Sequence, residues 1–333
     1  MIKAYAANEA KGEFKPFEYE PGELRPEQVE IKVHSCGLCH SDISIADNEW
    51  GFSQYPVVPG HEVIGEVIAR GDHVKHLDIG AIVGLGWFSG SCMHCLQCMS
   101  GNHNLCPSAE STILGRHGGF ADRVRCNAEW AIELPTDLDA AKAGPLFCGG
   151  ITVFNPIVEF DVKPTDRVAV LGVGGLGHLA LQFLNKWGCE VTAFSSNPAK
   201  EAEALSMGAH HVINSKDSSA LEKAAGSFDF ILSTVNVELD WPSYLGTLAP
   251  KGRFHTVGAI PTPMSIPAFS LIGAQRSVSG SPLGAPATTT RMLEFCARHG
   301  IAAVTEHFPM AKINDAFEHL RAGKARYRIV LDA

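Results

Sequence analysis

Four cysteines crowd one short segment of the chain and have the spacing of a metal site. Cys92, Cys95, Cys98 and Cys106 form the pattern C-x2-C-x2-C-x7-C. Two-residue spacing lets consecutive thiolates turn inward onto one ion, and a fourth thiolate from a short loop completes the tetrahedron that zinc prefers. Four thiolates leave no open coordination position, so the pattern predicts a structural zinc site. A redox C-x-x-C pair or unlinked free thiols are the alternative interpretations.

Three further segments hold soft ligands that are far apart along the chain. These segments read CGLCHSD, PGHEVIGEV and PLFCGGIT, and they contain Cys39, His61 and Cys148. Two thiolates, one imidazole and a vacant fourth position would be the arrangement of a catalytic zinc. Spacing alone leaves the alternatives open, because His61 could be a structural histidine and Cys148 a small buried hydrophobic residue.

A glycine-rich sequence predicts a dinucleotide site. Gly172, Gly174, Gly175, Leu176 and Gly177 belong to the GVGGLG sequence, which follows an apolar strand and precedes a helical pattern. In this context the first glycine makes a tight turn and the second lets the backbone approach a pyrophosphate. The third allows close helix–strand packing, and the helix N-terminus faces the phosphates. A glycine-rich turn without a ligand is the alternative.

The end of the second strand indicates which dinucleotide would bind. NAD sites place an acidic residue there for the ribose hydroxyl, but this stretch has no acidic residue before Glu201. It offers Ser195, Ser196, Asn197 and Lys200 instead. Hydroxyls, an amide and a lysine suit a 2′-phosphate, so the sequence predicts NADP(H). Capping of the following helix is the alternative role of these residues.

The elements around these motifs fall into two kinds. The first half reads as short strands and loops, with a Cys-rich insert at about 91–107 that could not form a core unaided. From about residue 165, strands and helices alternate, which predicts βαβ units and a parallel sheet. The expected strands there are 167–171, 190–194, 211–213, 229–234 and 253–257. The tail adds helices at about 289–298 and 313–322 and a strand at 327–331.

Composition excludes several classes of protein. The chain has 333 residues, a formal net charge of −9 and 10 cysteines. An acidic balance argues against a nucleic-acid binder or a protein of anionic membranes. The longest apolar stretch is broken by glycines and a histidine, so we expect no membrane span. With no leader visible, the cysteine content favours a reducing compartment, and we expect a cytoplasmic protein.

Taken together, these motifs resemble the zinc-dependent medium-chain alcohol dehydrogenases, and within them the cinnamyl-alcohol-dehydrogenase branch. The resemblance rests on CGLCHSD, GHEVIGEV, the four-cysteine insert, the Cys-Gly-Gly-Ile-Thr sequence and GVGGLG. The stretches DNEWGFSQYP, AFSSNPAKE, RSVSGS and GKARYRIVL resemble the bacterial broad-range NADPH-dependent aldehyde reductases of that branch. The match runs nearly from end to end.

The resemblance implies a role for individual residues. Cys39, His61 and Cys148 would hold a catalytic zinc, with Glu62 beside it as an occasional fourth ligand. Asp42 would orient His61, and Ser41 would exchange a proton with the substrate oxygen. The implied cofactor contacts include four residues outside the glycine motif and the second strand, namely His40, Thr152, Val257 and Arg328.

The resemblance also bears on the substrate pocket and the proton route. Trp50 and Trp87 occupy positions where relatives line the pocket, although core packing is their alternative role. Many relatives end the proton route on a histidine three residues after the relay hydroxyl. Here that position is Ser44, so we expect water or His40 to complete the route.

The implied architecture is an α/β protein of two domains. A GroES-like, β-rich catalytic domain would comprise 1–150 and 286–333, and a doubly wound Rossmann domain for NADP would comprise 151–285. The expected activity is reversible reduction of a broad range of aliphatic and aromatic aldehydes to primary alcohols by NADPH, with two zinc ions per chain. The resemblance also suggests a homodimer. An NAD-linked alcohol or polyol dehydrogenase and a non-catalytic zinc and nucleotide-binding protein are the alternatives.

Overall fold

The computed structural model describes all 333 residues and divides into two compact units. Unit 1 comprises Met1–Ile151 and Gly284–Ala333, and unit 2 comprises Thr152–Leu283. The first boundary falls within helix α4 (Gly149–Glu159). No helix in either unit has both the length and the apolar character that a membrane span requires.

Unit 1 is built mainly from strands. They are β1 (Ile2–Ala6), β2 (Lys15–Tyr19), β3 (Gln28–Leu38), β4 (Val63–Arg70), β5 (Ile82–Leu85), β6 (Phe88–Gly90), β7 (Glu110–Ser111), β8 (Arg123–Asn127), β9 (Ile132–Glu133), β16 (Thr305–Pro309) and β17 (Arg328–Asp332). Its helices are α1 (His40–Ala46), α2 (Leu96–Met99), α3 (Ala140–Ala143), α10 (Pro286–His299) and α11 (Ile313–Arg321). The largest sheet has the order β16-β17-β3-β4-β5-β9, and β8 also pairs with β3.

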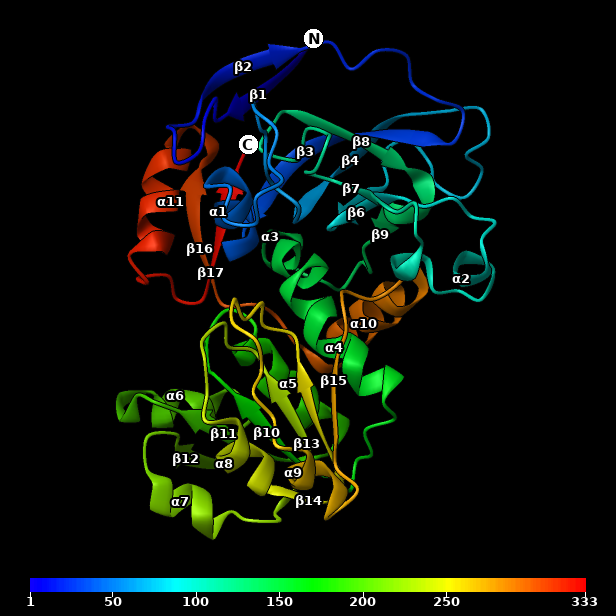
Figure 1. Cartoon of the computed structure of the whole chain (residues 1–333). Helices are drawn as coiled ribbons and strands as arrows, with labels where there is room; N and C mark the ends of the chain where they lie inside the picture. Colours follow the sequence, from blue (N-terminus) through cyan, green and yellow to red (C-terminus); the bar gives the residue numbers. More distant parts are fainter. The chain divides into compact units, whose positions relative to one another are not determined.

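Strand β3 is the centre of this sheet (Figure 1). Val29, Ile31 and Val33 alternate along it and are buried in the core, as their spacing predicts. The intervening Glu30 is buried too, which alternation does not predict. It accepts hydrogen bonds from Arg123 and Arg125 of β8, at 3.0 and 2.6 Å, so its charge is paired. The core of unit 1 therefore lies around the strand that ends immediately before Cys39.

Residues 91–107 form a lobe that stands out from the sheet of unit 1, and helix α2 lies in it (Figure 1). We call it the cysteine lobe. Large apolar side chains in it face solvent, with Leu96 77% and Met99 74% exposed, whereas Cys98 and Cys106 are buried. The sequence prediction that this insert lacks a hydrophobic core is confirmed.

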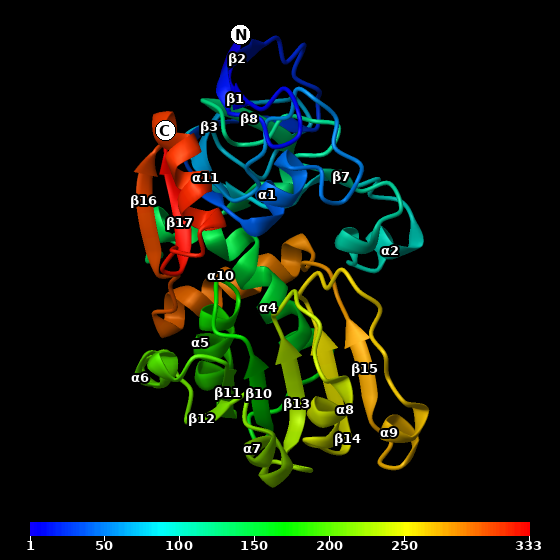
Figure 2. The same cartoon turned by 60° about the vertical axis from the view of Figure 1, so that its left-hand side comes forward.

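Unit 2 contains one parallel sheet of six strands with the order β12-β11-β10-β13-β14-β15. The strands are β10 (Arg167–Leu171), β11 (Glu190–Ser195), β12 (His211–Asn214), β13 (Phe228–Ser233), β14 (Leu248–Thr256) and β15 (Ser277–Gly280). The helices are α5 (Gly177–Trp187), α6 (Glu201–Ser206), α7 (Ser218–Lys223), α8 (Trp241–Gly246) and α9 (Ala268–Ile272). Figure 2 shows the strands side by side, and this is the doubly wound order 3-2-1-4-5-6.

The predicted elements of unit 2 are found close to their expected positions. Strand β10 has the predicted bounds, and α5 ends at Gly188, whose φ of 108° lies in the left-handed region that favours glycine. Strand β14 begins at Leu248 rather than near residue 253. It already pairs with β13 before the Pro-Lys-Gly sequence, and a bulge in the ladder accommodates that sequence within the strand. The prediction of an α/β protein with a doubly wound parallel sheet is confirmed.

Candidate functional site

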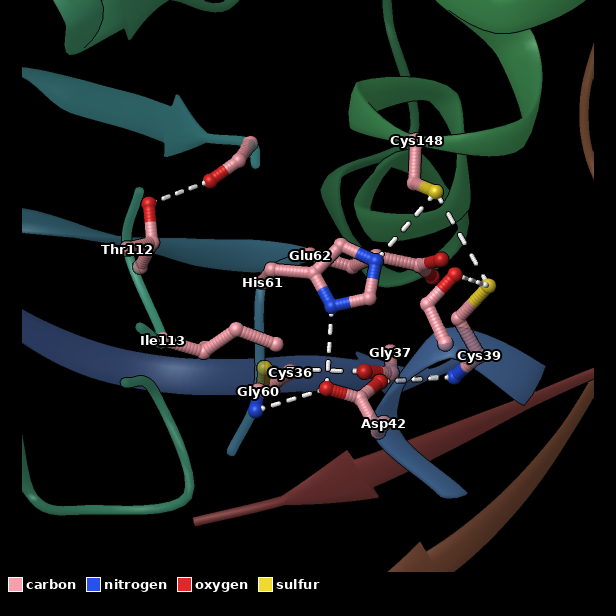
Figure 3. A network of polar contacts seen from close by, with 12 residues as sticks. Cys36, Gly37, Cys39, Asp42, Gly60, His61, Glu62, Thr112, Ile113 and Cys148 are labelled. Atoms are coloured by element: carbon pink, nitrogen blue, oxygen red, sulfur yellow. Dashed lines mark hydrogen bonds and ion pairs between the residues drawn. The ribbon is translucent and has the colours of Figure 1, made fainter. Parts of the chain in front are cut away.

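The dispersed soft ligands of unit 1 come together in one cluster. Cys39 follows β3, His61 precedes β4, and Cys148 precedes α4. The Sγ atoms of Cys39 and Cys148 are 3.8 Å apart, and His61 Nε2 lies 3.2 Å from Cys148 Sγ. One ligand atom from each of these residues and from Glu62 lies within 4.8 Å of the others, and all four residues are buried. We call Cys39, His61 and Cys148 the thiol–imidazole cluster (Figure 3).

Asp42 holds the geometry of this cluster. Its Oδ1 accepts hydrogen bonds from His61 Nδ1 and from the Gly60 amide, both at 2.9 Å, and its Oδ2 accepts from the Cys39 amide at 2.9 Å. Because Nδ1 of His61 carries the proton in this arrangement, Nε2 is left with a lone pair on the side of Cys148 (Figure 3). Asp42 has no exposed surface, and its carboxylate ties the start of α1 to the segment that precedes β4.

The donor set suits a zinc ion. A hydrogen bond with Cys148 holds the pKa of Cys39 well below its usual range, so this thiol is poised to be a thiolate. Two sulfurs and an imidazole nitrogen are ligands that Zn²⁺ prefers, and three of them leave one coordination position for a further oxygen. The residues present therefore fit a zinc with an open position.

Glu62 is part of an ion pair beside the cluster. Arg328 of β17 contacts Glu62 Oε1 through Nη2, and both side chains are almost fully buried. Glu62 Oε2 has no hydrogen-bond partner. Burial raises the pKa of Glu62 to about 7, although the Arg328 charge opposes this rise. A Cβ on Gly37 would lie 2.0 Å from Glu62 Oε2, so only glycine leaves room for this carboxylate.

Helix α1 carries the hydroxyl groups that could move protons. Ser41 Oγ lies 3.9 Å from Cys39 Sγ and is half-buried, whereas His40, the first residue of α1, is exposed. The buried Ser44 donates a 2.7 Å hydrogen bond to Glu49 Oε2. Glu49 itself is exposed. Sequence reasoning missed this carboxylate, because α1 ends at Ala46 and only the turn beyond it brings Glu49 back to Ser44.

Aromatic rings lie beside His61. The Trp87 ring meets the His61 ring edge to face, with centroids 5.1 Å apart. Trp50 lies 6.1 Å from Trp87, and Phe52 lies 5.8 Å from Trp50. Trp50 and Phe52 are 37% and 52% exposed, so neither is an ordinary core residue. The structure brings together both predicted tryptophans and adds Phe52, whose proximity the spacing did not indicate.

The four lobe cysteines form a second, closed group. Ligand atoms of Cys92, Cys95, Cys98 and Cys106 lie within 4.8 Å of one another. Backbone amides of Cys95 and Cys98 point at Cys92 Sγ and Cys95 Sγ, at 3.3 and 3.4 Å, as they do around thiolates that bind a metal. Four sulfurs fit a tetrahedral Zn²⁺ without an open position, and the lobe has little other means of holding its shape.

The glycine motif of unit 2 has the geometry of a phosphate cradle. Gly172 has a φ of 93°, and a Cβ there would lie 2.6 Å from Val235. A Cβ on Gly177 would lie 1.9 Å from the Gly172 oxygen, so this glycine allows α5 to pack against the turn. No atom lies within 4 Å of a Cβ built on Gly174. That open space, at the start of α5, fits the pyrophosphate of a dinucleotide.

The residues after β11 divide into two groups. Ser195 is buried, and its hydroxyl bonds the Asn197 backbone. Asn197 caps the following turn by accepting from the Ala199 amide at 3.0 Å. Ser196 is exposed, and Lys200 Nζ donates to the Val173 oxygen at 2.9 Å. The groups that a bound phosphate could reach are therefore Ser196 and Lys200, next to the glycine motif.

The remaining predicted cofactor residues lie on three different elements. Thr152 is in the first turn of α4 and is half-buried. Val257 follows β14, and its amide donates to Ser233 at 3.0 Å. Gly175 and Leu176 lead into α5. Val257 therefore lies at the carboxyl end of the parallel sheet, where ligands of this fold bind.

Comparisons with known proteins match both units. Residues 25–136 match the alcohol dehydrogenase GroES-like domain, and residues 175–298 match the zinc-binding dehydrogenase family. An aldehyde reductase from a Synechocystis strain is 57% identical over 331 residues, which cover 99% of this chain and 98% of the relative.

Solved structures agree with these matches. A cinnamyl alcohol dehydrogenase from Sorghum bicolor superposes with a TM-score of 0.95 and 36% identity, over 99% of this chain and 97% of that one. A cinnamyl alcohol dehydrogenase from Helicobacter pylori, complexed with NADP(H), gives a TM-score of 0.90 and 30% identity over 99% and 97% of the two chains.

Proposed function

Because this chain belongs to the zinc-dependent alcohol dehydrogenases, in their cinnamyl-alcohol-dehydrogenase branch, we propose that it reduces aldehydes to primary alcohols with NADPH. The observation that carries this proposal is the thiol–imidazole cluster, which offers three ligands and an open position. The 57% identity of the whole chain to an aldehyde reductase supports the reductive direction.

Cys39, His61 and Cys148 would hold the catalytic zinc, and Asp42 keeps His61 in the tautomer that can bind it. When bound, zinc would polarise the aldehyde carbonyl as a Lewis acid. The buried Glu62 lies next to these ligands and is restrained by Arg328, so it would serve as an occasional further ligand. Cys92, Cys95, Cys98 and Cys106 would hold the second, structural zinc.

The proton route starts at Ser41, whose hydroxyl lies beside the cluster and would protonate the substrate oxygen. Ser44 is buried and cannot store a proton at neutral pH, but its hydrogen bond reaches the exposed Glu49 carboxylate. We therefore assign Glu49 the solvent end of the route. This assignment replaces water or His40, and it leaves His40 as a contact for the cofactor phosphates.

NADPH would bind along the carboxyl edge of the unit 2 sheet and supply the hydride. Gly172, Gly174 and Gly177 shape the pyrophosphate site, with Gly175 and Leu176 offering amides at the start of α5. Ser196 and Lys200 would contact the 2′-phosphate, while Ser195 and Asn197 hold the turn that presents them. Thr152, Val257 and Arg328 complete the proposed cofactor contacts.

The substrate would meet an aromatic surface. Trp87 packs on His61, and Trp50 and Phe52 continue outward from it. Flat or aliphatic aldehydes would bury apolar surface on these rings, whereas a polyol would leave its hydroxyl groups unpaired there. This favours small aliphatic and aromatic aldehydes over sugars.

The test compares cofactors and metals on the purified full chain. We expect turnover of an aldehyde such as benzaldehyde with NADPH to exceed turnover with NADH, and removal of zinc by a chelator to abolish both. Faster turnover with NADH would favour an NAD-linked dehydrogenase. No turnover of any aldehyde by a chain holding two zinc ions would favour a non-catalytic role.

We also propose a homodimer in the reducing environment of the cytoplasm. Strand β15 pairs only with β14 in its sheet, so its outer edge offers unpaired backbone groups. Helix α9 lies close before it in sequence and exposes Phe269 by 84% and Ile272 by 67%. An open edge beside apolar side chains suits a second copy of the same surface.

A further inference from the structure

A histidine is buried in the parallel sheet of unit 2 with both ring nitrogens bonded. His255 of β14 has no exposed surface. Its Nδ1 lies 2.9 Å from Ser279 Oγ, and its Nε2 lies 3.0 Å from Ser281 Oγ. Ser279 is the register partner of His255 in β15. Ser281 lies one residue beyond Gly280, the last residue of β15 that pairs with β14.

The surroundings of this histidine are aromatic. The Phe160 ring lies 4.8 Å from it, and the Phe230 ring is nearly parallel to it at 6.0 Å. The charged group nearby is Arg253, whose guanidinium lies 4.4 Å from the Phe160 ring centre. Burial and this cation lower the pKa of His255 to about 4, so the ring is neutral at neutral pH. One ring nitrogen then donates a hydrogen bond and the other accepts one.

A polar ring in this place is costly unless both nitrogens are satisfied, because an unpaired buried polar group is destabilising. An apolar side chain would fill the same space between the phenyl rings without that cost. The role that the imidazole ring can fill, and an apolar side chain cannot, is to hold the two serines to which it is hydrogen-bonded. One partner lies within the paired strand, whereas the other lies in the segment after the strand.

That segment belongs to the carboxyl edge of the sheet. The residues that follow β13, β14 and β15 form a rim, which we define as Thr234–Val235, Val257–Gly258 and Ser281. The rim is tightly packed, because a Cβ on Gly258 would lie 1.9 Å from the Val235 oxygen. Beyond Gly280 the ladder has ended, so the bond from His255 replaces backbone pairing as a restraint on Ser281.

The position of the rim indicates which part of the cofactor it meets. A doubly wound sheet has two mononucleotide-binding halves, and the glycine motif after β10 assigns the adenosine side to β10, β11 and β12. The other half, β13 to β15, then receives the nicotinamide side. Ser281 is half-buried and lies on the rim of this second half.

We propose that His255 is a positioning residue for the nicotinamide half of the cofactor, acting through Ser281. It holds the segment after β15 in the place where the nicotinamide nucleotide binds, and it does not itself touch the ligand. The proposal rests on the proposed use of NADPH.

Two serine variants provide the test, because each leaves one ring nitrogen of His255 without its partner. Ser281→Ala releases the rim, and Ser279→Ala, the matched control, affects only the paired strand. The probes are NADPH and 2′,5′-ADP, which has the adenosine half alone. We expect Ser281→Ala to weaken NADPH binding about tenfold, the loss of roughly one hydrogen bond, with binding of 2′,5′-ADP unchanged. Ser279→Ala should bind both probes as the wild type does.

Steady-state kinetics give a second readout. Ser281→Ala and His255→Phe should raise KM for NADPH and leave KM for the aldehyde unchanged, which a general loss of stability would not do. The proposal is overturned if Ser281→Ala binds NADPH normally, or if Ser279→Ala weakens it as much. Failure of the wild type to bind either probe would instead reject the proposed function, so the two failures are distinguishable.

Discussion

At the scale of single residues, the proposed chemistry depends on side chains that two carboxylates, the buried Asp42 and the exposed Glu49, hold by hydrogen bonds. Asp42 accepts three hydrogen bonds and thereby orients both Cys39 and His61. Ser41 lies beside the same cluster, and Ser44 leads to Glu49 at the surface. Each hydroxyl thus has a different neighbour, which predicts different effects when it is removed.

Ser41→Ala should lower kcat severely, by about 10²–10⁴-fold, because it removes a general acid step. Ser44→Ala should be mild, under about tenfold, because water can replace a hydroxyl that only passes a proton to Glu49. The measurement is kcat against pH for both variants, with Ser53→Ala, a hydroxyl bonded to the Ile45 oxygen, as a control. A loss in Ser44→Ala as deep as in Ser41→Ala would contradict this assignment.

Cofactor preference should depend on Ser196. Ser196→Asp places a carboxylate where we expect the 2′-phosphate, so repulsion and a lost contact should cost roughly 2–4 kcal/mol. The NADPH/NADH ratio of kcat/KM should fall by about 30- to 1,000-fold, with Ser196→Ala as the uncharged control. Ser195→Asp should chiefly destabilise the turn, because Ser195 is buried and bonded to Asn197. An unchanged ratio in Ser196→Asp would mean that the phosphate binds elsewhere.

At the scale of elements, the two sets of metal ligands differ in how much the local fold depends on them. The cysteine lobe has few buried apolar residues, so its four sulfurs must hold it through a metal. The thiol–imidazole cluster lies next to the ends of β3, β4 and α4, and the hydrophobic core packing of β3 and β4 involves no ion. The unit 2 sheet also has an internal polar feature, His255, whose protonation couples to folding.

Cys95→Ser should lower the melting temperature and reduce zinc content from two ions per chain to one, because it opens the lobe site. Cys148→Ser should abolish turnover and leave the melting temperature close to that of wild type. Metal analysis and thermal unfolding of both variants check this. An active, fully folded wild-type chain with a single zinc would contradict the two-site assignment.

Acid should destabilise unit 2 through His255. Its folded pKa of about 4 lies below the value of 6.5 for an ordinary histidine. The unfolded chain therefore takes up a proton first, and stability is lost as pH falls from about 6.5 through 4. Between pH 7 and 5 the loss should be about 2 kcal/mol, since each pKa unit is worth about 1.36 kcal/mol. Melting curves at both pH values should show this loss in wild type and a smaller one in His255→Phe; equal losses would reject it.

At the scale of the whole molecule, the open edge of β15 and the apolar face of α9 predict association of two chains. The double variant F269D/I272D places two charges on that face and should be monomeric, since burying unpaired charges is costly. Light scattering during size-exclusion chromatography checks the mass, with L96D/M99D on the exposed face of the cysteine lobe as a control. A monomeric wild type would contradict the homodimer.

The sequence by itself determined the features whose residues lie close together along the chain. The four cysteines from Cys92 to Cys106 and the GVGGLG motif are local, so short loops are enough to bring their atoms together. The alternation of strands and helices after residue 165 can be read from hydrophobic periodicity, and this alternation predicted the parallel sheet. Residue types suggested the set of Cys39, His61 and Cys148, and resemblance to a known family, not spacing, favoured it over the alternatives.

Only the tertiary structure decided the contacts between distant segments. Arg328 and Glu62 are 266 residues apart, and Cys39 and Cys148 are 109 apart, so no local pattern encodes their meeting. The serines bonded to His255 lie 24 and 26 residues from it, and strand register places Ser279 opposite the ring. Such pairs depend on how strands are ordered and packed, which hydrophobic periodicity leaves undetermined because it specifies faces and not partners.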